Sequence, residues 1–451
     1  MTRLTNITDV ARTLRPLGAP PPGVLAGVER PAAPARALGR AVVDTFSQGP
    51  LAARAPVADS AFGEQTPTGA PAAQSAFEAK GLLGFKFPNM GGVVATLKAL
   101  GAMDTLLRGE QLSGSSVGNA VVTRDAQDVD AWADQRPTSE RYQAANAQVQ
   151  ANAQLEQEKL GNLAPEQRET YLRVKEQLMT IAPAGDPVAA LSLQKLLFTG
   201  KLTEGPSLRD GKNVMDGLSQ LSTGPLAEGI DRQQLLADLV QELATPSAIN
   251  QGPVGTCAGT SVGIHLLRNN PAEYVRLVAG LASPAGEVAT ASGKMLRREP
   301  DALTDGISRS QVQRLLVPAF MEIAHPRRDY QSGPEEGQYK NGDNKGTGLN
   351  AKEVDRILEA VYDDRFKKKN VGGFPLMRPK KAMERIEEQL AKGKDVLAGL
   401  EWESGGHKVV VTGTETVNGQ QYVNYINPWG REERMTRDEF MDRLNNFNYE
   451  D

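Results

Sequence analysis

The chain has few residues of the kinds that build disulfides, metal centres and aromatic ligand sites. Its 451 residues include one cysteine and three histidines, and aromatic residues make up 5%. One cysteine excludes an internal disulfide, so a reducing compartment or a bacterial host is expected. No apolar run reaches about 18 residues, and no signal-peptide pattern is visible. We therefore expect no transmembrane segment, and a protein that stays in the bacterial cytoplasm or is exported by a route other than Sec.

The net charge and the small number of cysteine and histidine residues argue against nucleic acid, anionic membranes and metal ions as partners. The formal net charge is −4, which indicates neither nucleic acid nor an anionic membrane as a partner. One cysteine and three dispersed histidines do not suit a zinc site. Residues 341–346 are similar to a calcium loop, but Lys345 occupies a ligand position and Lys352 stands where a bidentate glutamate is needed. We expect no metal and no cofactor, and the sequence does not indicate an oligomeric state.

Composition divides the chain into three predicted parts. Residues 1–79 are rich in Ala and Pro, which is typical of a disordered leader. This leader is interpreted either as a flexible tail or as a secretion signal or pro-segment. Residues 80–244 show helical periodicity and predict an all-α domain, whose role as a docking module, regulatory module or scaffold stays open. The helices expected in this second part cover residues 91–100, 138–160, 164–178, 188–197 and 233–240.

The third part, residues 245–451, mixes helical and strand patterns and predicts an α+β fold. Asn350 followed by Glu353 indicates a capped helix start, and Thr436 begins a final helix in the same way. Asn418-Gly419 is a strong hairpin turn. Residues 367–369, three lysines, are expected in a solvated loop. A further helix is expected over 380–392, and strands over 395–402, 407–413 and 421–427.

The only cysteine lies in a setting that favours a reactive thiol. A Gly- and Pro-rich loop within residues 250–261 leads into Cys257, and the following apolar residues predict a helix that Pro271 ends. The positive end of a helix dipole and its free backbone N–H groups both favour a thiolate. Gln251 carries a side-chain amide of the kind that stabilises an oxyanion beside such a sulfur.

Two downstream segments supply the groups that a nucleophilic thiol needs. Residues 405–413 place His407 at the head of a β-branched run, and residues 422–430 place Asn427 at the end of the next run. A nucleophilic cysteine needs a base, and the imidazole needs a third group that fixes its tautomer and orientation. Cys257, His407 and Asn427 suit these three roles.

These motifs, in this order, resemble the papain-like cysteine peptidase superfamily, and the Asn-Pro-Trp-Gly form is similar to calpains and their bacterial relatives. The resemblance covers residues 245–450. It implies a two-lobed catalytic domain in which a helical lobe faces an antiparallel sheet. It also implies Cys257 as nucleophile, His407 as base, Asn427 as orienting residue and Gln251 as oxyanion donor, with Trp429 covering the His–Asn hydrogen bond.

The sequence departs from the family at Ala258, where a tryptophan usually follows the nucleophile. His325 is a weaker alternative base because nothing around it orients a ring. The resemblance implies hydrolysis of peptide bonds in a protein or peptide substrate through a thioester. Two alternatives stay open: deamidation or transglutamination of glutamine side chains, and a catalytically silent papain-like fold that serves in binding.

Overall fold

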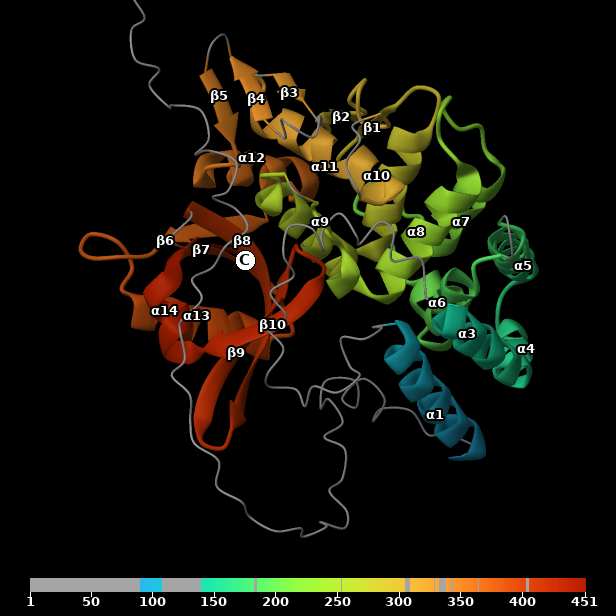
Figure 1. Ribbon diagram of the computed structural model, residues 1–451. Coiled ribbons are helices and arrows are strands. Elements are labelled where there is room, and N and C mark those ends of the chain that lie inside the picture. The colour runs from blue at the N-terminus through green and yellow to red at the C-terminus, as the bar shows by residue number, and fades with distance from the viewer. Residues whose placement is uncertain are drawn as a thin grey trace, which may run out of the picture. The chain divides into compact units, whose positions relative to one another are not determined.

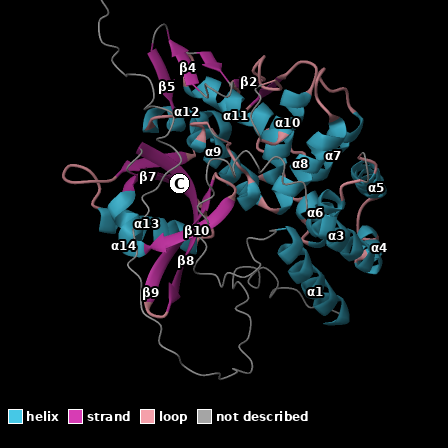
Figure 2. Cartoon of the chain, viewed as in Figure 1, coloured by secondary structure: helices cyan, strands magenta, loops and turns pink. Residues whose placement is uncertain are grey.

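The computed structural model describes residues 90–107, 139–181, 185–252, 254–304, 309–327, 329–331, 338–341, 344–363, 365–402 and 405–451. All of them belong to one unit, Ser47–Asp451. The predicted leader, residues 1–79, lies outside the described residues. Helices and strands both occur, which confirms the α+β class (Figure 2). In the described ranges, no helix is long and apolar enough to cross a membrane.

Regular structure in the described residues before 249 is entirely helical. Proline at the first position begins several of these helices, and Asp186 caps one of them by accepting hydrogen bonds from Val188 and Ala189. The elements are α1 (Met90–Leu107), α3 (Ser139–Ala151), α4 (Ala153–Leu160), α5 (Pro165–Met179), α6 (Pro187–Phe198), α7 (Val214–Thr223) and α8 (Arg232–Ala244), with short 3-10 turns η2 (Lys201–Thr203) and η3 (Pro246–Ala248).

The segment 138–160, expected as one solvated helix, differs from that prediction. It divides into α3 and α4 at Asn152, whose side-chain amide donates to Gln194 at 2.9 Å. Glu156 is buried and pairs with Lys175 at 2.6 Å. A buried carboxylate is costly unless a partner compensates its charge. The Glu156–Lys175 pair therefore makes this part of the polar segment an internal contact.

Between Cys257 and Tyr362 the described helices are α9 (Cys257–Asn269), α10 (Pro271–Ala282), α11 (Gln311–Ala324) and α12 (Ala351–Tyr362). As predicted, α9 ends before Pro271, and Asn350 and Glu353 form the capping box of α12. The sequence analysis did not predict α10 and α11. Short strands accompany these helices: β1 (Glu287–Ala289) pairs with β2 (Met295–Arg297), and β3 (Asp329–Gln331), β4 (Gln338–Asn341) and β5 (Asn344–Thr347) form a small sheet.

The main sheet has six antiparallel strands in the order β10-β9-β8-β7-β11-β6. Asn418 and Gly419 both have positive φ, as the predicted hairpin turn requires. The lysines at 367–369 do not form a loop as expected but lie in β6, where Lys368 pairs with Asp355 of α12. The strands are β6 (Phe366–Asn370), β7 (Val396–Trp402), β8 (Gly405–Val417), β9 (Gln420–Asn427), β10 (Arg431–Thr436) and β11 (Leu444–Glu450); α13 (Pro379–Ala391) and α14 (Arg437–Arg443) complete the chain.

The sheet separates two hydrophobic cores. Along β7, Leu397 belongs to the core that includes α9 and α12, whereas Val396 and Ala398 belong to the core that includes α13 and α14. Successive side chains of a strand point to opposite faces of the sheet, so this alternation shows that β7 is buried on both faces. Figure 1 shows α9 next to β8, in agreement with their contacts. The first core also contains residues of α1 to α8, so packing is continuous across residue 245.

Gly217 of α7 lies against Val275 of α10. A larger residue at position 217 therefore tests whether the core packs continuously across residue 245. A Cβ at Gly217 would lie 2.3 Å from Val275 Cγ1. We expect Gly217→Ala to lower the free energy of unfolding by about 1–3 kcal/mol through overpacking. Gly101→Ala in α1 is the control, because nothing lies within 4 Å of the added Cβ. Denaturant unfolding of both variants checks this, and equal stability of the two would contradict the packing.

Candidate active site

Cys257 begins α9 and is partly exposed. The loop before it is shaped by Asn250, whose Oδ1 accepts the N–H of Gly252 at 2.9 Å, and Gly252 has a φ of 75° that favours glycine. Thr256, at the N-cap position, makes no side-chain cap. The backbone N–H of Ala258, at the next position of the helix, lowers the Cys257 pKa. The start of α9 therefore directs a hydrogen-bond donor at the thiol, as the sequence predicts.

The edge of β8 lies against this helix. β8 begins at Gly405, but its pairing with β9 extends only to Val410. Among the described strands, its first residues therefore pair with β7 alone. At this edge the Lys408 carbonyl accepts a hydrogen bond from Ser261 Oγ at 2.8 Å. The backbone N–H of Lys408 also lowers the Cys257 pKa. The main chain beside His407 is thus joined to α9.

His407 and Asn427 are joined by a hydrogen bond of 2.9 Å between Nε2 and Oδ1. The backbone N–H of Trp429 lies 3.3 Å from the same Oδ1. Because a backbone N–H can only donate, the Asn427 amide must present its oxygen, and His407 Nε2 must carry the proton of the shared bond. Nδ1 is then left for Cys257, whose side chain raises the His407 pKa. The three side chains come together in the order that their predicted roles require.

Trp429 lies over the imidazole. Its ring stacks on His407 with centroids 4.4 Å apart and an interplanar angle of 30°. Trp402 of β7 lies 6.1 Å from the same imidazole, and His407 itself is only 7% exposed. These rings shield the His–Asn hydrogen bond from water, which strengthens it. This is the position that the family resemblance implies for Trp429.

The loop before α9 and the turn after β9 are bonded to each other. Asn250 and Trp429 form an isolated antiparallel bridge, and the Gln251 N–H donates to the Pro428 carbonyl at 2.7 Å. Gly430 has a φ of 80°, and a Cβ there would lie 3.4 Å from Asn250 Cβ. The close approach therefore favours glycine at this turn.

Gln251 is buried in this contact region. Its Nε2 donates to the Val254 carbonyl at 2.6 Å, which uses one of its two N–H bonds. No second acceptor for this amide group is found in the described part of the chain, and its Oε1 is buried there without a partner. The remaining N–H is thus available to an added ligand, while the role of oxyanion donor stays a prediction.

Opposing effects set the pKa values of the Cys257 and His407 side chains. Burial raises the pKa of Cys257, but the hydrogen bond and charge of His407 and two backbone N–H groups outweigh it, so that the pKa is lowered overall. Burial lowers the pKa of His407, but its hydrogen bonds to Cys257 and Asn427 and the charge on the sulfur raise it overall. Both shifts favour a thiolate–imidazolium pair.

Lys408 is a residue of this region that the sequence analysis missed. It is 5% exposed and donates from Nζ to Asn446 and Asn448 of β11, at 2.8 Å each. Its side chain passes Gly399 of β7, which pairs with both Lys408 and Asn446. Burial lowers the Lys408 pKa to about 7, although the charges of Asp355 and Cys257 oppose this. A lysine inside an otherwise apolar strand was the available signal.

Other candidate groups lie apart from this constellation. His265 is buried and contacts Tyr362 at 2.7 Å, whereas His325 pairs with Glu353 at 3.2 Å. Among the residues with described positions, the one group with metal-ligand spacing is Glu299, Glu322 and Asp329, which are not part of the site.

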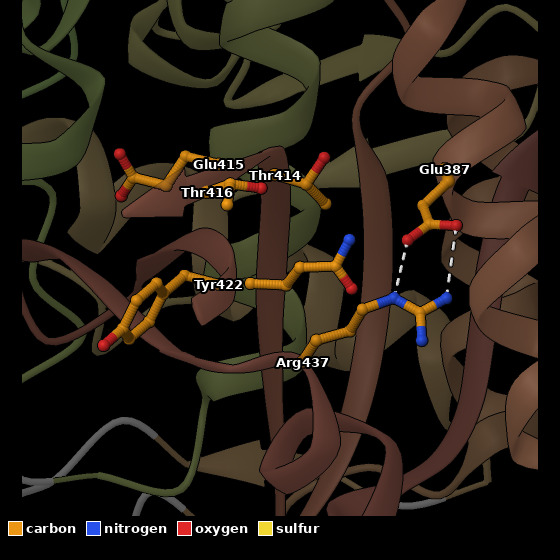
Figure 3. Close-up of a pocket in the computed structure, with 7 residues that line it drawn as sticks. Glu387, Thr414, Glu415, Thr416, Tyr422 and Arg437 are labelled. Carbon is orange, nitrogen blue, oxygen red and sulfur yellow. Dashed lines mark hydrogen bonds and ion pairs between the residues drawn. The ribbon is translucent and has the colours of Figure 1, made fainter. Parts of the chain in front are cut away.

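A pocket on the main sheet also lies away from the site. Figure 3 shows it at the other end of β8, where Arg437 pairs with Glu387 at 2.8 Å. Thr414, which lines it, is about 23 Å along the strand from His407, at roughly 3.3 Å per residue.

No protein-family model matches the chain, and a search of curated proteins found no match. The resemblance to papain-like peptidases therefore depends on the sequence motifs, together with the contacts among Cys257, His407, Asn427 and Trp429.

The pKa shifts predict how alkylation of Cys257 depends on pH. The thiolate forms as pH rises through the lowered Cys257 pKa, so iodoacetamide should react well below the ordinary thiol value of about 8.5. In His407→Ala the charge and hydrogen bond are lost while burial remains, so the reaction near pH 6 should slow at least about tenfold. Intact mass against time measures the rate, since Cys257 is the only thiol.

His325→Ala is the matched control for this measurement, because His325 pairs with Glu353. Its pH profile should equal that of the unmodified protein. A profile that titrates near pH 8.5 in all three proteins would show that His407 does not activate the thiol.

Proposed function

We propose that the protein is a papain-like cysteine peptidase that hydrolyses peptide bonds in a protein or peptide substrate. The observation that carries the proposal is the His407–Asn427 hydrogen bond, together with the mutual effect of Cys257 and His407 on their pKa values. A thiol, an imidazole of fixed tautomer and an orienting amide, in contact with one another, are the parts that covalent acyl transfer requires. The proposal includes the two-lobed architecture, with α9 on the helical side and β8 on the sheet.

The proposed reaction begins with attack of the Cys257 thiolate on an amide carbonyl carbon. The carbonyl becomes an oxyanion, which the backbone N–H of Cys257 and the free N–H of the Gln251 amide stabilise. His407, as imidazolium, gives its proton to the leaving amine, and a thioester remains on the sulfur. Water, deprotonated by His407, then releases the acid and restores the thiol. Asn427 keeps the ring in place through both steps.

The second candidate is deamidation or transglutamination of glutamine side chains. It uses the same thioester, and only the group that attacks this intermediate or the substrate that enters differs. The partial exposure of Cys257 and the shielded His–Asn bond favour acyl transfer over a purely binding role. They do not distinguish a backbone amide from a side-chain amide, so the products must be measured.

Product masses distinguish these reactions. We expect the full-length protein to fragment unfolded casein and a mixed peptide library, each new pair of ends adding about 18 mass units because water is consumed. Cys257→Ala is the control and should yield no fragments. Deamidation would instead shift glutamine peptides by about one unit without fragments. Intact, unchanged substrates with both proteins would contradict an acyl-transfer enzyme and favour the binding alternative.

Gln251→Ala tests the oxyanion assignment separately. Loss of one oxyanion donor should lower kcat by roughly 10²–10³-fold, which corresponds to about 2.7–4 kcal/mol. Because Gln251 also holds its loop through Val254, the alkylation rate of Cys257 serves as the control. Alkylation forms no oxyanion, so it should be unchanged. Equal losses in turnover and alkylation would mean that the variant disturbs the loop instead.

A further inference from the structure

Three carboxylates from separate segments converge beside α11. Glu299 follows β2, Glu322 lies in the last turn of α11, and Asp329 begins β3. One carboxylate oxygen from each lies within 4.8 Å of the other two. No contiguous motif joins these positions, which is why the sequence predicted no metal site here.

Glu299 is the unusual member of this group. It is 8% exposed, and no hydrogen bond or ion pair to its carboxylate is found among the described residues. Glu322 accepts one hydrogen bond, from the backbone N–H of Tyr330 at 2.9 Å. Within the same described ranges, no lysine or arginine pairs with Glu299, Glu322 or Asp329. A buried carboxylate without donor or cation is strongly unfavourable.

The surroundings add to the cost of ionising Glu299. Burial raises the pKa of Glu299 to about 8, and the charges of Glu322, Asp301 and Asp329 act in the same direction. Burial also raises the pKa of Glu322, although the Tyr330 N–H opposes it. Glu322 lies at the C-terminal, negative end of α11. The structure therefore gathers acids where a cation is favoured.

Glu242 shows that burial alone does not produce this arrangement. Burial raises its pKa to about 7, close to the value for Glu299. Its oxygens, however, accept hydrogen bonds from Tyr274 at 2.7 Å, Ser310 at 2.5 Å and Gln313 at 3.0 Å. A buried glutamate in this fold is thus normally provided with donors, and Glu299 lacks them.

We propose that Glu299, Glu322 and Asp329 bind a divalent cation, with calcium preferred. The donor set is entirely carboxylate oxygen, which selects hard cations. Two ligands of one Ca²⁺, at about 2.3–2.6 Å each, stand up to about 5 Å apart, whereas ligands of Mg²⁺ stand no more than about 4.2 Å apart. The oxygens all lie within 4.8 Å of one another, inside the separation of about 5 Å between opposite ligands of one Ca²⁺. Asp329 is exposed, so water completes the coordination on its side.

A cation at this position would stabilise the junction of α11 with β3. Met321, next to Glu322, packs against Gly259 in the first turn of α9, where an added Cβ would lie 3.3 Å from its sulfur. The site therefore supports the helix that presents Cys257. The proposal does not depend on the peptidase assignment, because it concerns binding and stability.

Calcium binding by the full-length protein, freed of metal with EDTA, tests this proposal. Calorimetric titration with CaCl₂ from about 10 µM to about 5 mM covers sensor-type and weaker extracellular sites. We expect one Ca²⁺ per chain and a rise in Tm of roughly 5 °C at saturation, with a smaller effect of MgCl₂. Glu299→Gln should bind no Ca²⁺. Its metal-free Tm should equal or exceed that of the unmodified protein, because the substitution removes a buried carboxyl group that has no donor or cation among the described residues.

Two further variants complete the test. Asp329→Asn, at an exposed position, should fold normally and bind Ca²⁺ at least about tenfold more weakly. Glu242→Gln is the control for a buried glutamate of raised pKa and should keep the Ca²⁺ affinity. No heat and no Tm shift with CaCl₂, or an unchanged affinity in Asp329→Asn, would overturn the proposal.

Discussion

The backbone contacts between the Asn250–Gln251 loop and the Pro428–Trp429 turn are the constraint on which the candidate site depends. They join the segment that begins α9 to the segment that ends β9. Since Cys257 lies a few residues after the first and Asn427 directly before the second, this contact fixes the sulfur relative to the amide. Ser261 and Lys408 hold α9 to β8 at a second place. Two attachments prevent the helix from pivoting about either one, so the imidazole stays within hydrogen-bonding reach of the thiol.

Burial disfavours the charged form of each ionisable side chain at the site. The charged form is favoured only where hydrogen bonds and opposite charges outweigh that cost. The Cys257 thiolate loses hydration but gains the N–H groups of Ala258 and Lys408 and the His407 charge. His407 shows the same competition with opposite sign. Lys408 is the case in which burial prevails, because its Asn446 and Asn448 partners are neutral and only more distant charges favour the ammonium. Cys257 and His407 therefore favour their charged forms because each lies beside the opposite charge of the other, whereas Lys408 has only neutral hydrogen-bond partners.

Much of the fold and of the candidate site could be predicted from local signals. The cap at Asn350, the turn at Asn418-Gly419 and the stop before Pro271 each depend on a few adjacent residues, and the structure has all three. The convergence of Cys257, His407 and Asn427 was expected from the motifs, because each motif prescribes a local geometry that a distant partner must match.

The errors occurred where a distant contact decides a local conformation. Lys367–Lys369 were expected in a loop because they are charged, yet Asp355 of α12 offers Lys368 a partner and the segment pairs with β11. Similarly, the polar stretch around Glu156 turns inward because Lys175 and Tyr171 face it. A charged residue is expected to be exposed unless the fold places an oppositely charged side chain beside it. A single sequence does not reveal which distant residue will be that partner.

The proposed chemistry does not use the side chain of Ala258. Papain-like peptidases usually have tryptophan at this place, and here a methyl group is buried in the main core. The backbone N–H of this residue lowers the Cys257 pKa, and any residue other than proline supplies such a group. The alanine therefore affects how the start of α9 packs, whereas the His407–Asn427 hydrogen bond does not involve its side chain.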